Sequence, residues 1–165
     1  MNKSFLKKLG LIVVVVALFL SAGQSAWGGF QEGFDAYKRG DYATALKEWR
    51  PLAEQGDALA QNNLGLMYDN GWGVPKDSKL VVKWYRKSAE QGHAKAQSNL
   101  GWMYGNGEGV PKDYVLSHMW FNLSAANGNK GGQKNRDIVE KRMTPSQIED
   151  AQRLAREWME KHRKK

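Results

Sequence analysis

The chain has 165 residues, of which 41% are hydrophobic and 25% are charged, a balance typical of a folded globular protein rather than a disordered one. It contains no cysteine, which excludes disulfide bonds, a thiol nucleophile and a thiolate metal site. The formal charge of +8 is uneven: residues 27–128 carry 11 basic and 11 acidic side chains, whereas residues 129–165 carry 11 and 6. A uniformly basic groove is therefore not predicted, and no nucleic-acid partner is expected.

Residues 1–26 have the pattern of a secretion signal. Lys3, Lys7 and Lys8 precede an apolar run from Leu11 to Leu20, and small residues follow up to Ala26. An uncleaved membrane anchor is the alternative, but the run is shorter than the ~20 residues that a spanning helix needs. We predict that residues 1–26 are a signal peptide and that the protein is periplasmic or secreted.

Residues 27–57 are predicted to form a degenerate helix pair. Asp41 is the expected N-cap of its second helix, which carries Trp49 and ends at Gly56. Asp41 precedes Asp77 by 36 residues, and Asp77 precedes Asp113 by the same interval. This spacing indicates that the segment is an early copy of the unit that follows.

An internal repeat of 36 residues dominates the centre of the chain, with units at residues 58–93 and 94–129. Residues 58–92 align without gaps on residues 94–128, with 20 identities in 35 positions. Each unit is predicted to be helix, loop, helix, because its apolar residues recur at spacings of three and four on both sides of a Gly-x-Gly-Val-Pro loop.

Three kinds of residue are predicted to shape each unit. Gly65 and Gly101 lie on the apolar side of the first helices, which predicts a neighbour too close to admit a side chain. Asp77 and Asp113 are the expected N-caps of the second helices. Glycines, at position 92 and again 36 residues later, are expected to end those helices.

Residues 130–165 are predicted to depart from the period and to form C-terminal capping helices with a basic tail. Thr144 and Gln147 form a capping box around Pro145. The helix that this box opens has one apolar stripe, formed by Ile148, Ala151, Leu154, Ala155 and Trp158. The stripe is suited to covering the exposed end of the last repeat.

The pattern Ala-x-x-x-Leu-Gly-x-x-Tyr-x-x-Gly-x-Gly-Val-Pro-x-Asp, followed by Trp and by Ala-x-x-Gly, resembles the Sel-one-like repeat (SLR) family, which is related to tetratricopeptide repeats. The resemblance is close over residues 58–128 and looser over residues 31–56. It implies an all-α fold: an α/α solenoid, or superhelix, of helix pairs with a C-terminal capping helix. It also implies that the first helices line a concave face that binds other proteins.

Catalytic and metal-binding patterns are scarce in the sequence. The one Ser-x-x-Lys pattern, Ser4 to Lys7, falls within the predicted signal, and there is no Gly-x-Ser-x-Gly or P-loop motif. His93, His118 and His162 are expected to be solvated surface residues. We therefore predict no catalytic residue, no metal site, no cofactor and no enzymatic activity.

The residues predicted to bind a partner lie on the first helices at positions that packing does not require. Asn63 and Asn99 share one repeat position, and their amides are suited to gripping a peptide backbone, while Lys95 attracts a carboxylate. Leu66 and Trp102 share a second position at which side-chain size varies. The alternative is structural: the asparagines satisfy loop backbone groups, and Trp102 packs between helices.

The leading functional hypothesis is a non-catalytic adaptor of the bacterial envelope, or a secreted one, that binds a peptide or partner protein on the concave face. Two alternatives remain. One is an envelope enzyme or regulator acting on peptidoglycan or β-lactams, and the other is binding to a polyanion or a membrane surface through the basic tail. The sequence fixes neither the partner nor the oligomeric state.

Overall fold

The computed structural model describes residues 28–162, and across this range all regular secondary structure is helical. The chain divides after Trp49 into two compact units, a boundary that falls within helix α2 (Tyr42–Glu54). The predicted signal peptide, residues 1–26, lies outside the described residues. Within those residues, no helix combines the length and the apolar character needed to cross a bilayer.

The unit that precedes the boundary contains a helix over residues 28–38 and the first part of α2. Trp49 joins the two, because its indole N–H donates to the carbonyl of Phe30 at 3.2 Å and its ring lies 5.7 Å from that of Tyr37. The Asp41 carboxylate accepts from the backbone N–H of Thr44 at 3.1 Å, which confirms the predicted N-cap.

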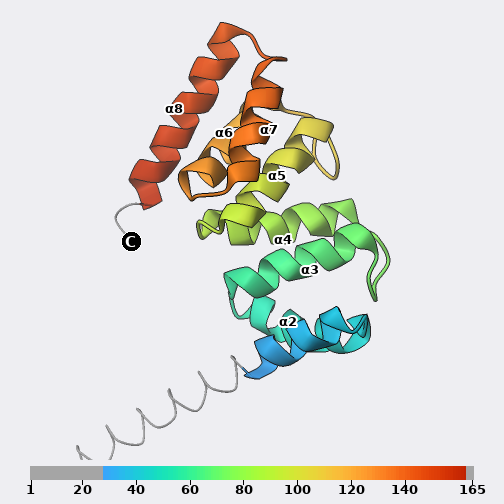
Figure 1. Cartoon of the computed structure of the whole chain (residues 1–165). Coiled ribbons are helices and arrows are strands. Elements are labelled where there is room, and N and C mark those ends of the chain that lie inside the picture. The colour runs from blue at the N-terminus through green and yellow to red at the C-terminus, as the bar shows by residue number, and fades with distance from the viewer. Residues whose placement is uncertain (1–27, 163–165) are drawn as a thin grey trace, which may run out of the picture. The chain divides into compact units, whose positions relative to one another are not determined.

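The unit that follows the boundary is an α/α solenoid in which helices pack in antiparallel pairs along the chain (Figure 1). Its helices after α2 are α3 (Ala58–Asn70), α4 (Ser78–Glu90), α5 (Ala94–Asn106), α6 (Tyr114–Ala126), α7 (Lys130–Glu140) and α8 (Pro145–His162). The first four form the two pairs that the repeat predicts. Helix α7 contacts both α5 and α6, and α8 packs on α6.

The helix boundaries follow from local side-chain chemistry. Asp77 accepts hydrogen bonds at the start of α4, and Asp113 does the same at the start of α6, so both predicted N-caps are confirmed. Gly71 and Gly107 end the preceding helices with φ values of 72° and 75°, a left-handed conformation that glycine adopts without strain. These caps set where each helix begins or ends.

Close contact between the helices of each pair depends on the predicted glycines. A Cβ atom added to Gly65 meets the ring of Tyr85 at 2.6 Å, and one added to Gly101 meets the ring of Phe121 at 2.9 Å. The neighbour predicted from the sequence is therefore an aromatic side chain of the second helix. It fills the space that the missing side chain leaves.

Buried polar side chains repeat with the same period and tie each second helix back to the first. Ser88 donates to the carbonyl of Ala58 at 2.6 Å, and Ser124 donates to that of Ala94 at 2.7 Å. Both serines are fully buried, so these bonds satisfy groups that are costly to leave unpaired. The framework therefore includes matched hydrogen bonds as well as apolar packing.

The C-terminal helices differ in part from the prediction. The capping box is confirmed, because Gln147 accepts from the Thr144 N–H at 2.9 Å and Thr144 Oγ1 accepts in return at 3.3 Å. On the stripe of α8, Ala151 and Ala155 are fully buried, and Trp158 packs against the core formed by α4, α5 and α6. The expected break in the period is wrong for α7, however, as its first residue follows that of α5 by 36 positions.

Helix α7 keeps the period because its N-cap makes the same type of hydrogen bond as the N-caps of α3 and α5, although the residue type differs. The N-caps of α3, α5 and α7 are Asp57, His93 and Asn129, and each side chain accepts a backbone N–H of the first turn. Gly132 then allows close contact with Ser124, which a Cβ atom would approach to 2.6 Å. Three different residue types thus start three equivalent helices.

Candidate functional site

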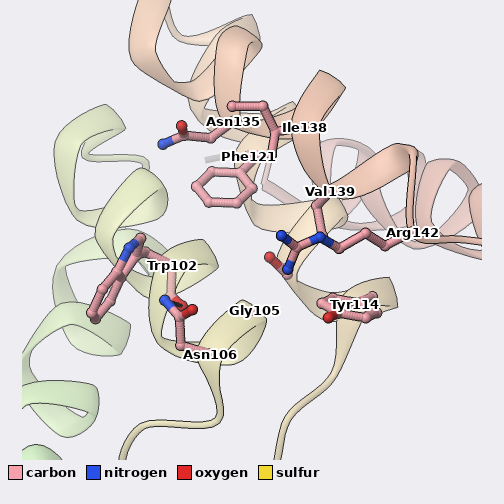
Figure 2. A pocket seen from close by; sticks show the side chains of 10 residues that line it. Trp102, Gly105, Asn106, Tyr114, Phe121, Asn135, Ile138, Val139 and Arg142 are labelled. Carbon is pink, nitrogen blue, oxygen red and sulfur yellow. Dashed lines mark hydrogen bonds between the residues drawn. The ribbon is translucent and has the colours of Figure 1, made fainter.

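The candidate site is a cleft of about 210 Å³ between α5, α6 and α7, shown in Figure 2. Helix α5 supplies one side, and α7, with Arg142 in the turn that follows it, supplies the other. The lining residues are Trp102, Gly105, Asn106, Tyr114, Ser117, Phe121, Asn135, Ile138, Val139 and Arg142. None of them is acidic.

The floor of the cleft is formed by Phe121 of α6, whose ring lies between α5 and α7 (Figure 2). Phe121 is only 4% exposed because Gly101 accommodates its ring. Beside it, the hydroxyl of Ser117 donates to the carbonyl of Gly101 at 2.7 Å. This bond and the Gly101 contact place α6 closely against α5, and they fix the depth of the site.

Two exposed apolar side chains flank the cleft. Trp102 is 46% exposed and Ile138 is 47% exposed, and they belong to α5 and α7 respectively. Exposed apolar side chains are ordinary when they are scattered, but two on opposite sides of one hollow form a surface that gains from being covered. Aromatic residues in such positions commonly contribute most of the binding energy at protein interfaces.

The side chains at one end of the cleft give it a positive charge. Hydrogen bonds from Lys112 and from Arg142 lower the pKa of the Tyr114 side chain below its ordinary value. Lys112 also lies over the Tyr114 ring, with its Nζ 4.9 Å from the ring centroid. An anionic group that enters the cleft therefore meets the Arg142 guanidinium, without a lining carboxylate to repel it.

Helix α7 is held in place by contacts that the sequence did not reveal. Its Glu140 Oε2 lies 3.1 Å from Nε2 of His118, a residue of α6. The prediction that His118 is solvated is wrong, because this side chain is 1% exposed. The aligned residue of the first repeat is Val82. An apolar residue at this repeat position indicates a buried site, so the burial of His118 could have been predicted from the alignment of the two repeats.

The other two histidines are also engaged within the fold. Nδ1 of His93 accepts from the backbone N–H of Ala96 at 3.3 Å, and burial lowers the pKa of this half-buried imidazole. The ring of His162 is stacked on that of Trp158, with the two centroids 3.9 Å apart. Across residues 28–162, no group of three or more acidic or histidine side chains is placed to hold a metal ion.

Of the residues predicted to bind a partner, Trp102 lines the cleft and the others lie elsewhere on the first helices. The amide of Asn99 donates to Asn62 at 3.4 Å, and Asn62 donates in turn to Asn63 at 3.3 Å. These amides therefore bridge α5 and α3. Lys95 is exposed in the first turn of α5, and Leu66 is half-buried on α3.

Two cleft residues were not predicted from the sequence. Each lies 36 positions after a residue that was predicted to bind a partner. Asn135 follows Asn99 by 36 residues, and Ile138 follows Trp102 by the same interval. The signal was the period itself, which had been expected to end before α7. Tyr114 and Arg142 have no such signal, because the corresponding residues 36 positions earlier are Ser78 and Asn106.

The fold and the repeated contacts define the protein as an α/α repeat protein, a class whose members serve as scaffolds for protein–protein interaction. The sequence pattern of the Sel1 repeat matches residues 58–93 and 94–129. The centre of the chain therefore consists of two tandem Sel1 repeats.

Solved structures of similar fold come from two bacteria. One is c5321, a protective antigen present in uropathogenic Escherichia coli strains that displays an SLR fold, with 36% identity, 86% of this chain covered and a TM-score of 0.80. Another is a Sel1 repeat protein from Oxalobacter formigenes, with 34% identity, 65% of this chain covered and a TM-score of 0.62.

The similar region is only part of each of these proteins. The match covers 32% of the Escherichia coli chain and 44% of the Oxalobacter formigenes chain. No curated protein sequence matches the chain.

Proposed function

We propose that the protein is a non-catalytic interaction scaffold that binds a segment of a partner protein in the cleft between α5, α6 and α7. The observation that carries this proposal is the pair of exposed apolar side chains, Trp102 and Ile138, on opposite sides of one hollow. The family fold supports the proposal, since Sel1-like repeats are characteristic of interaction modules.

The size of the cleft favours an anchoring side chain over a cofactor or a whole small-molecule substrate. Pockets for such ligands commonly measure about 300 to 1,000 Å³. The cleft measures about 210 Å³, and a cavity of roughly 150 Å³ is large enough to hold benzene. One apolar side chain of a partner therefore fills it.

We place this activity in the periplasm or outside the cell. The pattern of residues 1–26 supports that location. The basic C-terminal tail provides less support for a polyanion-binding role. Arg153, one of its cations, is paired with Asp150 and with Glu157 at 2.9 Å each.

Photocrosslinking from two matched positions tests this proposal. Ile138 and Leu59 are each 47% exposed, but only Ile138 lines the cleft. With p-benzoylphenylalanine at either position in native cells, we expect one discrete partner adduct from position 138 and none of that mass from position 59. Loss of the adduct on Trp102→Ala is expected as well.

An adduct of the same mass from both positions would contradict the assignment of the cleft. Mass spectrometry of the adduct identifies the partner and the segment that is attached. Circular dichroism of each variant provides the control for folding.

A further inference from the structure

We propose that the cleft recognises the C-terminal residue of its partner, with an apolar side chain against Phe121 and Trp102 and the terminal carboxylate on Arg142. This inference rests on the proposed function and specifies its ligand. It follows from the charges that line the cleft, from its volume and from the donors that remain available there.

Arg142 is placed to receive the carboxylate. A guanidinium has five N–H donors in a planar fork, so a hydrogen bond to the Tyr114 hydroxyl leaves donors for a bidentate contact with a carboxylate. Lys112 adds a second cation beside Tyr114. Both cations lower the pKa of the Tyr114 hydroxyl, because their hydrogen bonds favour its negatively charged form.

The volume of the cleft favours a C-terminal carboxylate over the side-chain carboxylate of an internal acidic residue. About 210 Å³ holds the side chain of one residue, so the apolar group and the carboxylate must come from nearly the same place in the partner. Only the last residue of a chain carries both. An internal acidic residue would place the carboxylate on a neighbouring side chain, outside this space.

The absence of lining carboxylates also distinguishes a peptide from a free amino acid. A free amino acid brings an ammonium group, which needs an acceptor of opposite charge, and none of the lining residues is acidic. A peptide brings a neutral amide instead. The side chain of Asn135, which lines the cleft beside Ile138, offers both a donor and an acceptor for that amide (Figure 2).

The test is an NMR titration of the protein lacking residues 1–26, following the indole N–H of Trp102. The probes are N-acetyl-phenylalanine, its amide N-acetyl-phenylalaninamide, free phenylalanine, and the dipeptide acetyl-Phe-Glu-amide with an internal carboxylate. We expect saturable shifts with N-acetyl-phenylalanine and an affinity about tenfold weaker for each of the other three, because each lacks one required group or adds an unpaired charge.

Two arginine variants separate a local contact from a general charge effect. Arg142→Asn, which introduces the residue found 36 positions earlier, is expected to bind N-acetyl-phenylalanine no better than its amide. Arg156→Asn removes an exposed charge from α8, away from the cleft, and is expected to leave binding unchanged. Equal thermal melting of the two variants provides the control for folding.

The outcomes distinguish this inference from the function on which it rests. Equal affinity for the acid and its amide overturns carboxylate recognition, and equal affinity for the dipeptide overturns the preference for a terminal residue. Absence of any binding, with the photocrosslink from position 138 retained, overturns the inference and leaves the proposed function in place. Absence of both overturns the two together.

Discussion

The two repeats at residues 58–93 and 94–129 share their framework and differ where the cleft lies. Helix caps, the close glycines and the buried serines recur at intervals of 36 residues. The repeat is therefore a structural unit that recurs with the same caps and internal contacts. Conservation within the unit reports on packing rather than on binding.

Several of the differences lie at positions that line the cleft in the second copy. Trp102 replaces Leu66, Gly105 replaces Asp69 and Tyr114 replaces Ser78, while Arg142 stands where the preceding period has Asn106. The second copy thus has more aromatic surface and one carboxylate fewer at the cleft, and the segment after it adds a cation. Duplication provided the scaffold, and divergence at a few exposed positions gave one copy its own chemistry.

The largest expected effect comes from the shared framework. Gly65→Ala and Gly101→Ala each force a Cβ atom against an aromatic ring, at 2.6 Å from Tyr85 and at 2.9 Å from Phe121 respectively. Such overpacking costs about 1 to 3 kcal/mol, partly offset by up to about 1 kcal/mol from the better helix propensity of alanine.

Urea denaturation is expected to show both variants destabilised, Gly65→Ala more than Gly101→Ala because its contact is closer. Lys95→Ala, at an exposed position, is the control and is expected to change the free energy of unfolding by less than about 0.5 kcal/mol. A stabilised Gly65→Ala variant would show that the close approach is not needed.

Much of this framework could be predicted from the sequence because its determinants are local. Helix pairs follow from apolar spacing, and caps follow from Asp, Thr and Gly residues at fixed offsets, as at Asp77 and Asp113. Helix α7 could not be predicted in register, since its N-cap, Asn129, differs from His93 in type and Gly131 and Gly132 lower its helix propensity.

The site was harder to predict than the fold because it depends on contacts between helices. Trp102 was found from variation within one repeat position, whereas Arg142 and Tyr114 come together only when α7 packs beside α5 and α6. The burial of His118 likewise arises from contact with Glu140. No spacing within a single helix encodes such contacts.

A smaller effect distinguishes the aromatic residues of the two copies at high pH. Burial, with the nearby charge of Asp69, raises the pKa of Tyr85 above its ordinary value, whereas Phe121 at the aligned position does not titrate. A raised pKa means that the folded state prefers the neutral phenol. Its contribution to stability is therefore complete below about pH 10 and is lost as the pH rises beyond that value.

The variant Tyr85→Phe removes this titration. From pH 9 to pH 11 the wild type is expected to lose about 1.4 kcal/mol more stability than the variant, measured by urea denaturation at each pH. Equal losses would show that the Tyr85 hydroxyl reaches water in the folded state.

The most direct measurement of the central claim replaces three cleft residues by those found 36 positions earlier in the chain. The triple variant Trp102→Leu, Tyr114→Ser and Arg142→Asn changes only half-buried or exposed positions, so its helical circular dichroism is expected to match that of the wild type. With p-benzoylphenylalanine at position 138, the account predicts a folded protein that no longer forms the partner adduct. An undiminished adduct from that folded variant would contradict the claim that these residues form the binding site.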